Sequence, residues 1–238
     1  MFQAWRSAAA CANLEVYASR VLDDPRYRED HAPAAPRKIG RRLWAFDCLS
    51  CDKCLPVCPN AAIFTFTLPR GARTRPVLGL VDGTWRVVAE RTLTLDGPHQ
   101  IAILDDLCND CGNCDVFCPE DGGPNLRKPR LFGTEDGWRA ATIDGYFVAH
   151  RDGADVTLAR HDGREYRAEV VGHRTCFDGP GFSVVLDGTS SPGIAGRADE
   201  GAEVDLLWLD TMTALHRAVR SPATLNWVNC LDTAPPTT

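Results

Sequence analysis

The sequence lacks several features that mark common classes of protein. It has no uninterrupted run of about 18 apolar residues, the length that a membrane-spanning helix requires. It has no Gly-x-Gly-x-x-Gly after a strand-like stretch, no Walker lysine loop and no His-Glu-x-x-His motif, so nothing predicts a nucleotide site or a zinc-protease site. Acidic residues outnumber basic ones by 32 to 26, which argues against a nucleic-acid-binding protein, whose surface is usually basic.

The chain also lacks a convincing secretion signal. Its N-terminal segment is rich in alanine, but the uncharged core is short and Glu15 follows closely. We therefore expect a cytoplasmic protein that binds neither membranes nor nucleic acid. Disulfides are rare in a reducing compartment, so the eleven cysteines of the chain predict metal ligation instead.

Eight of these cysteines form two copies of one motif. CLSCDKCLPVCP begins at residue 48 and CNDCGNCDVFCP begins at residue 108, each with the spacing Cys-x2-Cys-x2-Cys-x3-Cys-Pro. This spacing is typical of bacterial ferredoxins with two 4Fe–4S clusters, in which the fourth cysteine of each motif ligates the other cluster. We predict that cluster 1 binds Cys48, Cys51, Cys54 and Cys118, and that cluster 2 binds Cys108, Cys111, Cys114 and Cys58.

Another interpretation of the eight motif cysteines is weaker. A pair of zinc sites would also use Cys-x2-Cys pairs, but three evenly spaced cysteines, a fourth before proline and duplication of the unit are unusual for zinc. The remaining cysteines, Cys11, Cys176 and Cys230, have no such neighbours, and we interpret them as small apolar residues.

Charged and apolar neighbours of the motifs are expected to tune and shield the clusters. Asp110 and Asp115 place negative charge beside cluster 2, whereas Asp52 and Lys53 balance each other beside cluster 1, which predicts a lower potential for cluster 2. We expect four apolar residues to pack around the clusters: Ile63, Phe64, Val116 and Phe117. A basic run is interpreted as a solvated face or, alternatively, a docking patch: Arg37, Lys38, Arg41 and Arg42.

The fold is predicted to be α+β, with a two-cluster ferredoxin-like core over residues 44–130. Residues 1–43 read as an amphipathic helix, over about 2–22, and a connector. β-branched runs around Asp-Gly pairs predict a β-hairpin inserted at about 68–100 and further hairpins after residue 145, because Asp-Gly favours tight turns. Residues 131–238 are expected to form a β-rich extension that ends in a helix over about 203–220, followed by a loose tail.

The second motif and its flanks carry a family resemblance. QIAILDDLCNDCGNCDVFCPEDGGP, residues 100–124, together with the β-rich segment after it, resembles the C-terminal region of the selenate reductase flavoprotein subunit, which is grouped with the glutamate synthase small subunit and dihydropyrimidine dehydrogenase. The resemblance implies that clusters relay electrons between a flavin and a second redox centre. Because this chain has no flavin or NAD(P)H domain, both cofactors would belong to a partner subunit.

These observations predict a non-catalytic electron-transfer subunit of a multi-subunit cytoplasmic oxidoreductase. Its partner would be a subunit that contains flavin, molybdenum or both, in a hetero-oligomer. Alternatively, the clusters hold the fold and the complex together, with the C-terminal region as an assembly module. A third hypothesis, an enzyme with a pocket in residues 130–200, has no convergent catalytic groups to support it, and the six scattered histidines are expected to have no chemical role.

Overall fold

The computed structural model describes residues 38–188 and 193–230, together with a few scattered positions between residues 8 and 23. Most of the helix and connector predicted for residues 1–43, and the tail predicted to be loose, therefore lie outside the described residues. Residues 38–238 cluster as one unit, and the description below concerns that unit. None of the described helices combines the length and the hydropathy needed to cross a membrane.

Within the described residues, nine strands form one mixed sheet in the order β1-β4-β5-β6-β7-β8-β9-β10-β11. Neighbouring strands are antiparallel, except that β5 runs parallel to both β4 and β6. The strands are β1 (Ile63–Thr67), β4 (His99–Leu104), β5 (Arg130–Leu131), β6 (Gly145–Arg151), β7 (Ala154–His161), β8 (Arg164–Val171), β9 (Arg174–Gly179), β10 (Phe182–Asp187) and β11 (Gly193–Ala198). The boundary predicted between residues 130 and 131 falls inside β5, and the sheet runs across it.

A long hairpin separates β1 from β4, as the sequence predicts. Its strands β2 (Gly71–Val81) and β3 (Thr84–Leu95) pair antiparallel, and the two-residue strand β12 (Val204–Asp205) adds to β2. The connecting Asp82 and Gly83 both have positive φ, 49° and 72°, as do the Asp-Gly pairs at 152–153 and 162–163. Two consecutive positive φ angles define the type I′ turn, which matches the twist of the flanking strands.

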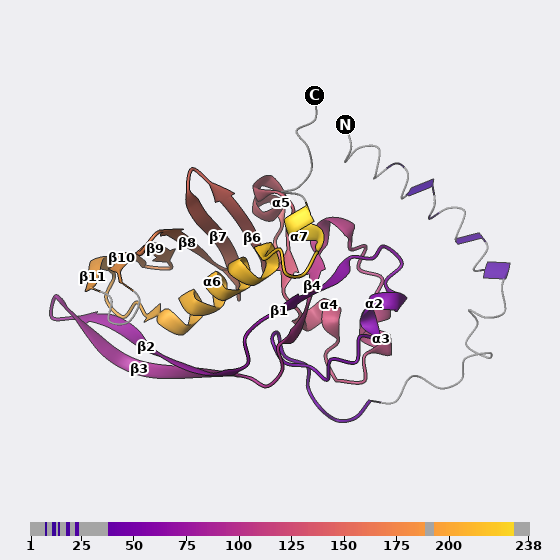
Figure 1. The fold of residues 1–238 in the computed structure, drawn as a ribbon, viewed down its shortest axis with the longest axis horizontal. Helices are drawn as coiled ribbons and strands as arrows, with labels where there is room; N and C mark the ends of the chain where they lie inside the picture. Colours follow the sequence, from indigo (N-terminus) through magenta and orange to yellow (C-terminus); the bar gives the residue numbers. More distant parts are fainter. Residues whose placement is uncertain are drawn as a thin grey trace. The chain divides into compact units, whose positions relative to one another are not determined.

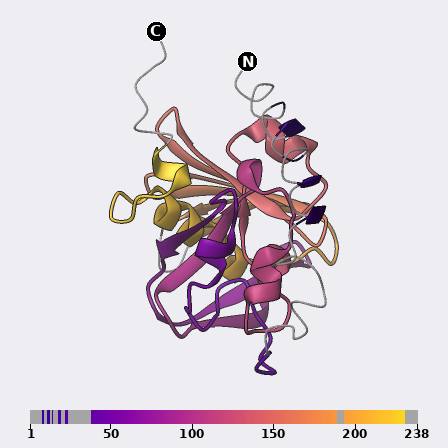
Figure 2. The ribbon, with the colours of Figure 1, turned by 90° about the vertical axis from the view of Figure 1, so that its right-hand side faces the viewer.

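The helices that the structure describes from residue 38 onward are short, apart from one. They are α2 (Cys54–Val57), the 3-10 helix η3 (Asp105–Leu107), α3 (Asn113–Phe117), α4 (Pro124–Arg127), α5 (Glu135–Ala140), α6 (Leu206–Arg220) and α7 (Trp227–Cys230). In Figures 1 and 2, α2, α3 and α4 lie together, with β1 and β4 beside them. Figure 1 shows β9–β11 at the far end of the sheet. The structure is thus α+β, as predicted.

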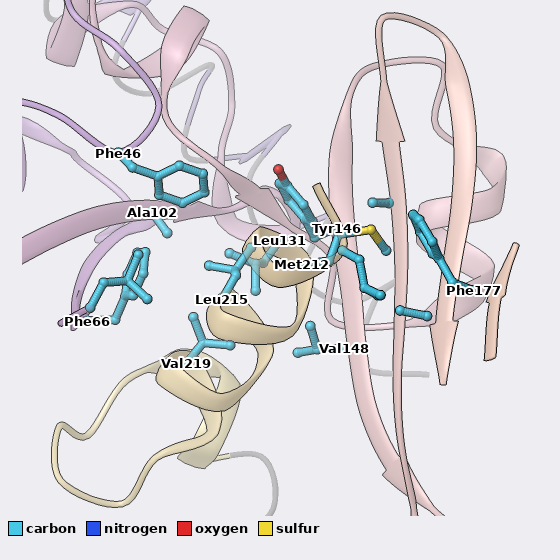
Figure 3. Packing of buried hydrophobic residues seen from close by; sticks show 14 of the residues in the cluster. Phe46, Phe66, Ala102, Leu131, Tyr146, Val148, Phe177, Met212, Leu215 and Val219 are labelled. Carbon is cyan, nitrogen blue, oxygen red and sulfur yellow. The ribbon is translucent and has the colours of Figure 1, made fainter. Parts of the chain in front are cut away.

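The main hydrophobic core lies between α6 and its neighbours. Asp205 caps the helix, because its Oδ1 accepts hydrogen bonds from the N–H groups of Leu207 and Trp208 at 2.9 and 3.1 Å. Met212 and Leu215 are fully buried and belong to one core with residues of strands β6–β10 and residues near the first cysteine motif, such as Phe46 and Phe66 (Figure 3). The helix predicted over about 203–220 is therefore confirmed as α6. Its buried face belongs to a core shared by the cysteine-bearing part of the chain and by the strands that follow it.

Candidate metal centre

The two cysteine motifs follow the same backbone course. The residue two positions after the first cysteine is left-handed in both loops: Ser50 has φ 52° and Asp110 has φ 53°. The residue four positions after it is left-handed as well: Asp52 has φ 55° and Gly112 has φ 73°. Each loop thus curls back on itself twice before a one-turn helix, α2 or α3, begins.

Backbone N–H groups point at the cysteine sulfurs inside these loops. The N–H of Ser50 lies 3.4 Å from Cys48 Sγ, and the N–H of Asp110 lies 3.4 Å from Cys108 Sγ. The N–H of Ala62 donates to Cys58 Sγ at 3.2 Å. Hydrogen bonds from amides stabilise a charged sulfur, so these loops are suited to hold thiolates that bind a metal.

One pocket collects cysteines from both motifs. Its lining contains Cys48, Cys51 and Cys54 of the first motif and Cys118 of the second. Cys118 reaches this place because residues 39–43 run beside residues 119–121: the N–H of Leu43 donates to Asp121 O and the N–H of Asp121 donates to Arg41 O, both at 2.8 Å. The structure therefore brings together the four residues predicted to bind cluster 1.

Three of the other four predicted ligands contact a small apolar cluster that also contains Cys54 of the first motif. Cys114 is buried in this cluster with Ile63, Ile101 and Ile103, and Cys58 and Cys108 pack against it. Cys111 is exposed, as is Cys51 in the first motif. Each motif thus has one exposed cysteine; the first has one buried cysteine, Cys54, and the second has two, Cys114 and Cys118.

Burial makes the inner thiols poor acids in the free protein. It raises the pKa of Cys54 and the pKa of Cys114 to about 12, and it raises the pKa of Cys108 and Cys118 as well. A metal must displace these protons, because it binds the thiolate. Two sets of sulfur donors with aligned amides have the donor chemistry that an iron–sulfur cluster requires, so the residues present fit such a group.

Two buried charged residues that the sequence analysis missed border the first pocket. Lys128 and Glu120 are 4% and 1% exposed, and both line the pocket with the cysteines. Glu120 Oε2 accepts a hydrogen bond from the N–H of Leu49 at 3.1 Å, and its Oε1 lies 3.2 Å from Arg41 Nε. In the sequence both residues stand among polar loop residues, where no pattern signals that they are buried.

A third buried charge, Arg130, lies beside the second motif. Its guanidinium forms ion pairs with Asp105 and Asp110 and donates to Asn125 Oδ1 at 2.7 Å. The pKa of Asp110 is held below its usual range, chiefly by its hydrogen bond with Arg130. Asn125 in turn donates its backbone N–H to Asp115 Oδ1 at 2.7 Å.

The expectation that four apolar residues pack around the clusters is wrong for two of them. Ile63 and Phe64 are buried, but Val116 and Phe117 are 52% and 47% exposed and do not shield the site. The inward side of the one-turn helix α3 is taken by Cys114, so these two residues face outward.

Part of the basic run is also engaged within the chain, not free on a solvated face. Lys38 Nζ donates to the carbonyl oxygens of Asp115, Cys118 and Glu120, and the Arg42 guanidinium lies 4.8 Å from the ring centre of Trp44. Arg37 lies outside the described residues. The run therefore helps to fasten the segment before the first motif to the segment around Cys118.

Comparison with known proteins agrees with the cysteine pattern. Residues 44–121 match the family described as the 4Fe-4S dicluster domain. Over 98 residues, the chain is 30% identical to the proteins named "Putative oxidoreductase YgfK" of Escherichia coli K12 and of Escherichia coli O157:H7. The matched stretch is 41% of this chain but 7% of the length of these relatives. No solved structure matches the chain. The chain therefore contains a ferredoxin-like region of the 4Fe–4S type.

Proposed function

We propose that this protein is the electron-transfer subunit of a cytoplasmic oxidoreductase and holds two 4Fe–4S clusters. The first would be bound by Cys48, Cys51, Cys54 and Cys118, and the second by Cys108, Cys111, Cys114 and Cys58. Bound clusters would supply one-electron transfer. The observation that carries the proposal is the pocket whose lining combines three sulfurs of one motif with the fourth of the other.

The chain's own residues would hold the clusters, shield them and leave one side of each open. The amide N–H groups of Ser50 and Asp110 would stabilise thiolate charge, and Ile101 and Ile103 would keep water from the space between the two sites. The exposed sulfurs of Cys51 and Cys111 would mark where electrons enter and leave. A partner subunit with a flavin linked to NAD(P)H, and a second flavin or molybdenum centre, would act as donor and acceptor.

Iron and sulfide analysis of anaerobically prepared protein tests the proposal. We expect about eight irons per chain, because each cubane contains four. Substituting Cys54→Ser should lower the iron content, whereas the matched control Cys176→Ser, in β9, should not. About four irons or fewer in the unchanged protein, or zinc in their place, would overturn the proposal.

A structural role for the clusters is the second candidate. It is favoured by the apolar cluster around Cys114, which contains residues of both motifs and would be fastened by bound metal. Cys51→Ser separates the two candidates, because Cys51 is exposed and contributes little to the packing. Loss of electron transfer from a complex that still assembles favours the electron-transfer role, and loss of assembly favours the structural one.

A further inference from the structure

Lys128 brings an uncancelled positive charge to the first cysteine pocket. It is 4% exposed, and its Nζ donates to three backbone carbonyl oxygens: Trp44 O at 3.0 Å, Ala45 O at 3.2 Å and Asp47 O at 3.2 Å. Burial lowers the pKa of Lys128. An ammonium has three N–H donors and a neutral amine has two, so the three acceptors favour the charged form against this effect. Carbonyl groups are neutral, so they hold this charge in place without neutralising it.

The other charges around the first pocket nearly balance. Arg41 lies 2.6 Å from Asp47 and 3.2 Å from Glu120, so one cation faces two carboxylates. Lys38, like Lys128, has its ammonium on backbone carbonyls. Asp52 and Lys53 also line the pocket, and their charges cancel. With Lys128, four cations therefore face three anions, and the first pocket has an excess of one positive charge.

The surroundings of the second motif have the opposite sign. Arg130 lies between Asp105 and Asp110, which together outweigh its charge. The carboxylate of Asp115 lies nearby, with its Oδ1 3.8 Å from Cys114 Sγ. Arg130 faces three anions, and an excess of one negative charge remains when Lys38, whose Nζ lies 2.8 Å from Asp115 O, is counted here as well. Lys128 and Arg130 stand two positions apart in the chain, and only Arg130 is neutralised by direct ion pairs.

We propose that Lys128 is a positioning residue that raises the reduction potential of the first site above that of the second. This inference rests on the proposed function. Reduction adds one negative charge to a site, and a nearby buried cation stabilises that charge more than a cation in water does. An electron from a reduced flavin partner would enter at the second site, pass to the first and leave to an oxidised acceptor. Lys128 would thus set the direction of transfer inside the chain.

Redox titration of both clusters by EPR tests this role. The signal of the first site is identified by its change in Cys51→Ser. In Lys128→Met, which keeps the length of the side chain and removes the charge, we expect the midpoint potential of the first site to fall and that of the second to stay. The matched control is Arg86→Met, which removes an exposed cation from β3 and should leave both potentials unchanged. Lys128→Arg should restore the potential of the first site.

A second substitution keeps the test valid if Lys128→Met does not fold or bind iron. Glu120→Gln removes the buried anion of the same pocket and should raise the potential of the first site. An unchanged first potential in a fully iron-loaded Lys128→Met protein, or an equal shift of both sites, would overturn the role of Lys128. Absence of two clusters from the unchanged protein would instead overturn the proposed function, and iron analysis before the titration distinguishes the two failures.

Discussion

Gly123 is predicted to be indispensable for the second cysteine loop. It precedes α4 with φ 64° and ψ 155°, a conformation that is essentially restricted to glycine. A Cβ atom added there would lie 2.1 Å from Asp115 Oδ1, closer than two non-bonded atoms can approach. The Asp115 carboxylate would have to move away and release the N–H of Asn125, which it binds at 2.7 Å.

The cost of Gly123→Ala follows from these two losses. The strained backbone costs about 1–3 kcal/mol, and the lost hydrogen bond to a carboxylate costs about 1.5–3 kcal/mol. The free energy of unfolding should therefore fall by about 2.5–6 kcal/mol. Gly153→Ala is the matched control: its φ is 74° and nothing lies within 4 Å of the added Cβ, so only the left-handed penalty of about 1–2 kcal/mol applies.

Urea unfolding followed by circular dichroism, on the two variants and the unchanged protein prepared in the same way, measures the difference. Iron analysis of the same samples should find less metal in Gly123→Ala and a normal content in Gly153→Ala. Equal destabilisation of the two variants would refute the reasoning, because it would mean that Asp115 moves aside at no cost.

Three further predictions concern the fold. Met212→Ala should lower the free energy of unfolding by about 2–5 kcal/mol, because it opens a cavity in a fully buried position, and Leu225→Ala, at 79% exposure, should change it little. Burial lowers the pKa of His216 below its usual 6.5, so the unfolded state binds the proton more tightly than the folded state does. The stability that His216 contributes should be fully present above about pH 6.5 and be lost as the pH falls through the folded pKa. Urea midpoints measured from pH 8 to 5 should therefore depend less on pH in His216→Asn than in the unchanged protein. Trp138→Phe should lower the free energy of unfolding by about 1–3 kcal/mol, because the indole N–H donates to Gly145 O at 3.1 Å and its loss leaves this buried carbonyl without that donor. Thermal or urea unfolding measures the change. A variant as stable as the unchanged protein would show that another donor replaces the indole.

Features that depend on neighbouring residues could be predicted from the sequence. The Asp-Gly pairs at 82–83, 152–153 and 162–163 place tight turns where the structure has them, because a turn is decided by the conformations of its own residues. The apolar residues of α6 recur at helical spacing, so a helix can also be predicted from the segment's own residues. The repeated cysteine spacing predicts two equivalent loops, and the matching φ angles of Ser50 and Asp110 agree with it.

Features that depend on distant residues could not be predicted. Lys128 and Arg130 read as ordinary polar residues around a proline, and their burial depends on segments up to 84 positions away in the chain. The outward orientation of Val116 and Phe117 follows from the inward orientation of Cys114 in a one-turn helix, a choice that hydrophobicity alone does not make. The parallel strand β5 is two residues long and carries no periodicity.

The position of β5 has a consequence for anyone who wishes to isolate the metal-binding part of the chain. Its Leu131 is fully buried in a core that also contains Phe46 and Phe66, which precede it in the sequence, and Met212 and Leu215, which follow it (Figure 3). A fragment cut after residue 130 would lose most of the buried residues of this core and would expose the remaining ones to solvent. The smallest piece expected to fold alone therefore extends through α6, far beyond the last cysteine of the second motif.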